Sequence, residues 1–165
     1  MSKRLLVLSF LVFLSSTLYA YSDFSSIAPS GQTLYYEIRG NNVVVTNPLN
    51  TDFGGWSTYE KPAGDLTIPS SVNYGNVEYP VVGIGHYAFS LCGNLTSVTI
   101  PNSVTLVEEY AFRECVGLTG VVIPSSVVYL GEGAFYGCEG LASAAMSNSV
   151  TIIREQTFSG CFNLA

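Results

Sequence analysis

Residues 95–117 read LTSVTIPNSVTLVEEYAFRECVG, and the spacing of this stretch recurs along the chain. Phenylalanines stand 23 residues apart, and columns of cysteine, leucine and valine keep the same step. The four columns are Phe89, Phe112, Phe135 and Phe158; Cys92, Cys115, Cys138 and Cys161; Leu95, Leu118, Leu141 and Leu164; and Val81, Val104, Val127 and Val150. Columns in one phase over four units are the signature of a repeat protein, whose units stack to bury a continuous core.

Each unit combines a short strand with a turn. Val98 and Ile100 alternate with Thr99, which predicts a strand with the two aliphatic side chains inward and the threonine outward. Pro101 ends this strand, because proline has no N–H for the ladder. The Ala–Phe segment around Phe112, with a cysteine three residues later, predicts a helical or 3₁₀ turn that points both side chains inward. The period therefore predicts a leucine-rich-repeat solenoid of the α/β class, dominated by β structure, with parallel strands, one per 23-residue coil.

The segment before the regular repeat predicts a cap made of β-strands. Residues 33–38 alternate between apolar and polar side chains, residues 40–42 mark a turn, and residues 43–46 can return as a second strand. The aromatic side chains expected to pack in this region are Phe53, Trp56 and Tyr59. We predict an N-terminal β-hairpin cap over residues 21–65, because the terminal units of a solenoid need one. An independent ligand-binding domain over the same residues is the alternative.

The repeat extends over residues 66–165, with two irregularities. The strand phrase LTIPSSV at residues 66–72 precedes its equivalent by 32 residues rather than 23, which indicates a nine-residue insertion around residues 73–80. In the fourth unit AAMS at residues 144–147 replaces the usual V-x-I-P, and the sequence stops one residue past the next strand's first leucine. We therefore expect about four coils, the last incomplete with an open apolar face. Either the chain is a fragment of a longer protein or a partner covers this end.

The N-terminus predicts export. Lys3 and Arg4 precede an apolar run at residues 5–14 that only Ser9 interrupts, and a cleavage site follows Ala20. The run is shorter than the roughly 20 residues that span a bilayer, so residues 1–20 are interpreted as a signal peptide, with an uncleaved anchor as the alternative. Cleavage leaves four basic against twelve acidic residues, a formal charge of −8. This balance argues against nucleic acid and anionic membranes as partners.

Four cysteines in an exported chain suggest a disulfide framework, but their even spacing argues against it. Equivalent positions in neighbouring coils lie about 5 Å apart with roughly parallel side chains. A disulfide needs converging Cβ atoms about 3.8 Å apart. We therefore expect a buried ladder of free thiols beside the phenylalanines.

The single histidine, His86, does not indicate a catalytic or metal site. It aligns with Glu109, Glu132 and Glu155 in the repeat, so we interpret it as a solvated turn residue. A metal site needs several ligands at matched spacing, and a catalytic histidine needs a nucleophile or an acid beside it. Glu108 and Glu109 are adjacent in a turn, so their carboxylates do not form a hydrolytic pair. We expect no enzymatic activity, no metal and no cofactor.

The residues that carry the period also carry a family resemblance. The run at residues 95–104, followed by Ala111, Phe112 and Cys115, resembles the BspA-type repeat of bacterial surface proteins over about residues 66–165. The resemblance implies a secreted or cell-surface protein, often an adhesin that binds host matrix proteins or other cells.

Two groups of residues are candidates for contact with a partner. Outward strand positions are small and nearly uncharged, whereas the edge loops carry tyrosine and arginine, which are common in binding hot spots. The candidates are Thr96, Thr99, Thr119, Val122, Tyr110, Arg113, Tyr129 and Tyr136. We predict an extracellular protein-binding or adhesion module, whose partner is a host matrix protein or another cell-surface protein, not nucleic acid or a small-molecule substrate. The alternative is a structural spacer or a truncated, non-binding fragment of a longer leucine-rich-repeat protein.

Overall fold

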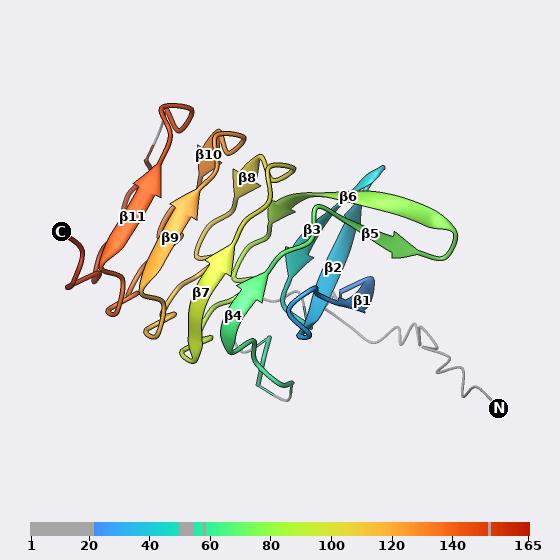
Figure 1. Ribbon diagram of the computed structural model, residues 1–165, viewed down its shortest axis with the longest axis horizontal. Coiled ribbons are helices and arrows are strands. Elements are labelled where there is room, and N and C mark those ends of the chain that lie inside the picture. Colours follow the sequence, from blue (N-terminus) through green and yellow to red (C-terminus); the bar gives the residue numbers. More distant parts are fainter. Residues whose placement is uncertain (1–21, 50–54, 58, 152) are drawn as a thin grey trace, which may run out of the picture.

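Consecutive coils of the chain lie side by side, and one strand from each coil enters a four-stranded parallel sheet (Figure 1). The computed structural model describes residues 22–49, 55–57, 59–151 and 153–165. The predicted signal peptide at residues 1–20 and Phe53 lie outside the described residues. The strands of this sheet, in chain order, are β4 (Gly64–Thr67), β7 (Leu95–Thr99), β9 (Gly120–Ile123) and β11 (Ser143–Met146).

A second sheet continues from the cap into the solenoid. Its path runs β1-β2-β3-β6-β8-β10, antiparallel from β1 to β3 and parallel from β3 to β10. The strands are β1 (Phe24–Ile27), β2 (Thr33–Arg39), β3 (Asn42–Thr46), β6 (Val77–Ile84), β8 (Leu106–Val107) and β10 (Tyr129–Leu130). The regular coils therefore contribute a second, two-residue strand beyond the one that the sequence predicted. Two residues are too few to produce a readable alternation.

The core is a stack of phenylalanine rings between the two sheets. Ring centroids of Phe89 and Phe112 lie 5.1 Å apart, as do those of Phe112 and Phe135, and the step to Phe158 is 5.6 Å. The first three rings are fully buried. Val98 and Ile100 are buried beside them, so the predicted inward columns are confirmed.

The turn that carries each phenylalanine is not helical, which corrects the prediction of a helical or 3₁₀ turn. The N–H of Cys115 donates to the Phe112 carbonyl within the turn, at 3.2 Å, but the N–H of Phe112 donates sideways to Ala134 of the next coil, at 2.8 Å. Tyr110 and Glu114 have positive φ angles of 55° and 56°. These left-handed residues reverse the peptide direction, so that neighbouring coils rather than the turn itself satisfy alternate N–H groups.

The cysteines form the free-thiol ladder that their spacing predicted. All four are unpaired, and three of them are buried. Each thiol of the later three donates to the carbonyl of a phenylalanine one coil earlier, as Cys115 Sγ does to Phe89 O at 3.1 Å. Burial raises the pKa of the Cys92 and Cys138 thiols to about 12. These side chains therefore serve as small apolar core residues with weak hydrogen bonds.

The predicted hairpin of the cap is present as β2 and β3, with β1 added at its outer edge. Tyr35 packs edge-on against Trp56 and Tyr59, with centroid distances of 5.7 and 5.6 Å. The indole N–H of Trp56 donates to Ala88 O at 2.8 Å, which ties the cap to the first coil. Within the described residues, no helix has the length and apolar character needed to cross a membrane.

The cap also covers the outer edge of β4 with side chains instead of a strand. Gln32 Nε2 donates to the carbonyls of Ala63 and Asp65, at 2.7 and 3.1 Å. The N–H of Thr67 donates to Ser30 Oγ at 3.0 Å. An edge strand with satisfied backbone groups is a poor template for pairing with another chain.

The predicted insertion is a β-hairpin. β5 (Ser71–Tyr74) pairs antiparallel with the first half of β6, and the turn between them contains Gly75 with a φ of +64°. The second half of β6 returns to the parallel ladder beside β8. In Figure 1 the hairpin projects away from the stacked coils.

Candidate functional site

The eight candidate residues fall into two groups on different parts of the coil. Four of them lie on or next to strands of the four-stranded sheet and are exposed; these are Thr96, Thr99, Thr119 and Val122. Three others, Tyr110, Arg113 and Tyr136, lie in the turns that follow the second sheet. Tyr129 lies on β10 of the second sheet, which corrects its assignment to an edge loop. The candidates therefore do not form a single site.

The face of the four-stranded sheet is occupied by small side chains whose hydroxyls bond within the sheet. The hydroxyls of Thr96 and Ser97 donate to Asp65 Oδ1 at 3.1 and 2.7 Å. These hydrogen bonds, with that from Ser97 the larger, lower the pKa of the Asp65 carboxyl. The hydroxyl of Thr119 donates to Thr96 O at 3.3 Å. Val122 is 67% exposed and makes this surface partly apolar.

The turn group is held in place by aromatic and charged contacts. The ring of Tyr110 stacks on Tyr87 with a centroid distance of 5.2 Å, and its hydroxyl donates to Glu132 Oε1 at 2.7 Å. That hydrogen bond is the main cause of the raised pKa of Tyr110. A Cβ atom at Gly133 would lie 2.3 Å from the Tyr110 ring, so glycine leaves the ring its space. The guanidinium of Arg113 lies 5.9 Å from the ring centroid of Tyr136.

A depression opens on the outer face of β8 and β10, a feature that the repeat pattern does not predict. Its lining combines aliphatic, aromatic and acidic side chains. The lining residues are Thr105, Leu106, Glu108, Glu109, Val128 and Tyr129. Val128 is 58% exposed at its rim. Of the eight candidates, only Tyr129 belongs to this lining.

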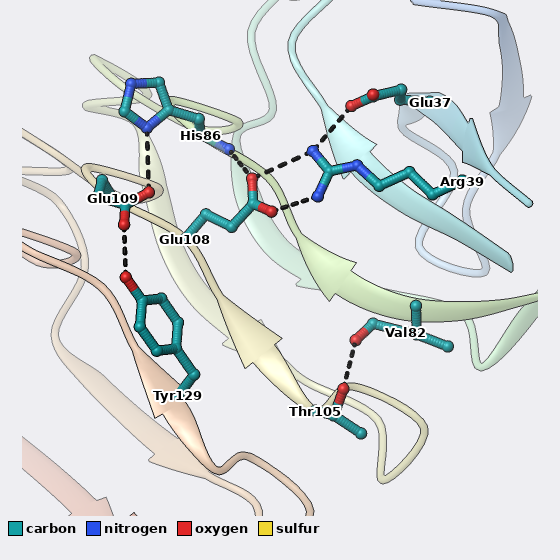
Figure 2. A network of polar contacts seen from close by, with 8 residues as sticks. All are labelled: Glu37, Arg39, Val82, His86, Thr105, Glu108, Glu109 and Tyr129. Atoms are coloured by element: carbon teal, nitrogen blue, oxygen red, sulfur yellow. Dashed lines mark hydrogen bonds and ion pairs between the residues drawn. The ribbon is translucent and has the colours of Figure 1, made fainter. Parts of the chain in front are cut away.

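A network of polar contacts borders the depression (Figure 2). The Glu108 carboxylate pairs with the guanidinium of Arg39 from the cap and accepts the backbone N–H of His86 at 2.9 Å. Arg39 also pairs with Glu37 at 2.9 Å. The hydrogen bonds to these two carboxylates raise the pKa of Arg39, with that to Glu108 the largest cause. The network thus joins the cap to the second sheet beside the depression.

The neighbouring Glu109 carboxylate has different partners. It accepts the hydroxyl proton of Tyr129, and its Oε2 lies 3.5 Å from His86 Nδ1. Burial raises the pKa of the Glu109 carboxyl, but the hydrogen bond from Tyr129 and the interactions with His86 outweigh it, so the net pKa is lowered. The same hydrogen bond raises the pKa of Tyr129. Near neutral pH, Glu109 is therefore charged and Tyr129 keeps its proton.

One sequence signal points to the depression. Val82, Thr105 and Val128 stand 23 residues apart, which is the column that faces outward from the second sheet. Recognising the short second strand would have revealed it. Arg39 lies outside the repeat, so no spacing relates it to Glu108.

Within the described residues, no group of three histidine, cysteine, aspartate or glutamate side chains is placed to hold a metal ion.

A stack of 23-residue coils with a parallel ladder on two sides defines the leucine-rich-repeat class of solenoids. The sequence profile of the BspA type leucine rich repeat region matches residues 64–165 in six copies. The chain therefore belongs to the BspA-type leucine-rich-repeat family. No curated protein matches this sequence significantly.

Comparison with solved structures finds similar bacterial proteins, of which the first below supports the same fold. A leucine-rich repeat protein from Bacteroides capillosus is 22% identical, with a TM-score of 0.50, and the match covers 70% of this chain and 94% of that one. A leucine-rich repeat protein from Bacteroides ovatus is 22% identical, with a TM-score of 0.47 and coverage of 86% and 46%. A leucine rich cell surface protein from Faecalibacterium prausnitzii is 22% identical, with a TM-score of 0.45 and coverage of 84% and 47%. The chain spans about half the length of the latter two proteins.

Proposed function

We propose that this protein is an extracellular protein-binding module that acts as an adhesin at the cell surface after export by its N-terminal segment. Membership of the BspA-type family supports a role in protein interaction, because stacked repeats present extended surfaces to their partners. The charged and apolar pattern of residues 1–20 supports export. The partner is a host matrix protein or a protein on another cell, and the chain is not an enzyme.

The observation that carries this proposal is the depression on β8 and β10, whose lining residue Glu109 directly precedes Tyr110 in the turn that also carries Arg113. Tyrosine and arginine dominate the energetics of protein interfaces. The hydroxyls of Tyr110 and Tyr129 are already held by glutamates. Binding a partner there costs little side-chain entropy, because these rings are ordered beforehand.

The face of the four-stranded sheet is the weaker choice for the partner. The hydroxyls of Thr96 and Thr119 are used in hydrogen bonds within the sheet, and threonine and valine are under-represented among hot-spot residues. A flat surface of small side chains suits lateral packing, which is what a structural spacer would use. This face therefore supports the spacer as a second candidate function.

The experiment is binding of the purified full chain to immobilised fibronectin, immobilised fibrinogen and whole cells. Saturable binding to at least one of them is expected. Arg113→Ala and Tyr136→Ala should each weaken it about tenfold, whereas Thr99→Ala should change it by less than about twofold. Circular dichroism melts establish that each variant is folded. Absence of saturable binding from a folded sample would contradict adhesion and favour the spacer.

A further inference from the structure

The depression on β8 and β10 is amphipathic. Leu106 and Val128 supply its aliphatic part, and Val128 is 58% exposed. The polar lining residues are the carboxylates of Glu108 and Glu109, the Tyr129 hydroxyl and Thr105, and Figure 2 shows the Tyr129 hydroxyl pointing to Glu109, with Thr105 apart from both carboxylates. An occupant that fits must therefore be apolar along its length and polar at one tip.

The polar end accepts hydrogen bonds more than it donates them. Glu108 is already used by Arg39 and by the N–H of His86. Glu109 remains charged, and Tyr129 donates its only hydroxyl proton to it. The Tyr129 oxygen keeps lone pairs that can accept a hydrogen bond. Arg154 lies near the same ring, but its guanidinium is over the ring face, 6.0 Å from the centroid. The tip of an occupant should therefore be a cationic donor.

We propose that this depression binds a lysine side chain from a basic segment of a partner protein. Lysine has a four-carbon apolar stem and a compact ammonium group with three donors. The stem would lie along Leu106 and Val128, and the ammonium would bond to Glu109 and to the Tyr129 oxygen. The proposal rests on the protein-binding function above and specifies the chemistry of its partner.

Two features favour lysine in a basic segment over other occupants. One oxygen of Glu109 accepts from Tyr129 and the other faces His86, so no open pair of oxygens remains for the planar fork of an arginine. The predicted mature chain has four basic against twelve acidic residues. This excess of negative charge steers a basic partner toward the surface and disfavours an acidic one.

The test uses the purified full chain and a short fluorescent peptide of alternating lysine and serine, with binding followed by fluorescence anisotropy. The same peptide with acetylated lysines, and one with arginine in place of lysine, are the comparison probes. Binding of the lysine peptide should be saturable and should weaken as salt is added. The acetylated peptide, which lacks the charge, should bind at least about tenfold more weakly, and the arginine peptide should also bind more weakly.

The key variant is Val128→Arg, which fills the depression and places a positive charge in it. It should raise the Kd about tenfold or more, because like charges are brought together. Val116→Arg is the matched control, since Val116 is an exposed valine in a turn outside the depression, 45% exposed. Equivalent positions in the neighbouring coils carry Gly93 and Glu139, so an arginine is tolerated there. The control should change the Kd by less than about twofold, because Val116 does not line the depression and an exposed charge in water is screened by salt.

Glu109→Gln keeps the shape of the depression but removes its charge. It should weaken lysine-peptide binding about tenfold, and it provides the test if Val128→Arg does not fold. Equal weakening by Val128→Arg and Val116→Arg would overturn the proposal, because only general charge attraction would then be acting. Equal or tighter binding of the acetylated or arginine peptide would also overturn it.

The lysine site and the adhesin function can fail separately. Matrix-protein binding that Val128→Arg leaves intact, together with no binding of the lysine peptide, would overturn the lysine site and leave the adhesin function standing. Lysine-peptide binding that Val128→Arg abolishes, without binding to any matrix protein or cell, would support the site and contradict the adhesin function.

Discussion

An interior coil and the last coil of this solenoid carry equivalent residues in different surroundings. Phe112 has a stacked phenylalanine on each side at 5.1 Å and is fully buried. Among the residues that the structure describes, Phe158 stacks only on Phe135, at 5.6 Å, and it is partly buried. In the same way Cys115 is buried, whereas Cys161 is of intermediate exposure. Burial in this fold thus depends on a neighbouring coil on both sides as well as on the side chain itself.

At the N-terminal end of the stack, the cap takes the place of a neighbouring coil and covers the first one. Gln32 and Ser30 provide side-chain hydrogen bonds to the edge of β4, and Trp56 is buried against the first coil. At the last coil, Phe162 is 82% exposed. Equivalent residues should therefore contribute differently to stability, depending on whether a coil or the cap covers them on each side.

The largest expected effect is at the centre of the ring stack. Phe112→Ala should lower the free energy of unfolding by about 3–5 kcal/mol, because it removes a buried ring and leaves a cavity between two others. Urea denaturation followed by circular dichroism measures this change. A melting temperature within a degree or two of wild type would show that Phe112 does not contribute to the core in this way.

The matched change in the last coil should be smaller. Phe158→Ala should cost about 1–2 kcal/mol, because the ring is partly exposed and has one stacking partner. The same urea titration applies to both variants. Equal losses for Phe112→Ala and Phe158→Ala would contradict the dependence on two neighbouring coils.

The side chains that cover the edge of β4 should contribute modestly to the free energy of unfolding. Gln32→Ala removes two hydrogen bonds to carbonyls and should cost about 1 kcal/mol. Asn41→Ala, at an exposed turn position of the cap, is the control and should lie within about 0.5 kcal/mol of wild type. If the two variants have the same stability, the Gln32 bonds are dispensable.

The smallest expected effect is a difference in reactivity among the four cysteine thiols, with no change in stability. Burial raises the pKa of all four cysteines, well above the ordinary range for Cys115 and less so for Cys161. Because the thiolate is the reactive form, iodoacetamide should label Cys161 first, and its labelling should speed up as pH rises. The three buried thiols should react only as the chain opens. Mass spectrometry of digested protein gives the order, and labelling of Cys115 alongside Cys161 would contradict it.

Much of the solenoid could be predicted from sequence because its core positions recur with one period. The phenylalanine, cysteine, leucine and valine columns identified the inward side chains, and Pro101 marked the end of a strand. The alternating left-handed residues of the turns could not be predicted, because Tyr110 and Glu114 are not glycine and carry no φ signal. Their conformation depends on hydrogen bonds to the neighbouring coil.

The candidate site was less accessible to prediction. The residue type of Tyr129 predicts a role in binding, but the sequence wrongly predicts a loop there, because β10 has only two residues. The sequence relates Glu108 only to its neighbour Glu109, whereas its partner Arg39 lies 69 residues away in the cap. Contacts between a repeat and a non-repeating segment have no periodic signal, so only the folded structure reveals them.

The β5–β6 hairpin identifies a corner of the coil that is suited to protein engineering. The 32-residue step, in place of 23, adds nine residues there, yet β4 and β6 still pair with β7 and β8. The N–H of Val81 donates to Ser70 O at 2.9 Å, which closes the base of the hairpin before the chain rejoins the stack. The equivalent corner at residues 102–103 is therefore a graft point for a foreign loop or epitope. Grafts at successive coils would be displayed in a row at a spacing of about 5 Å.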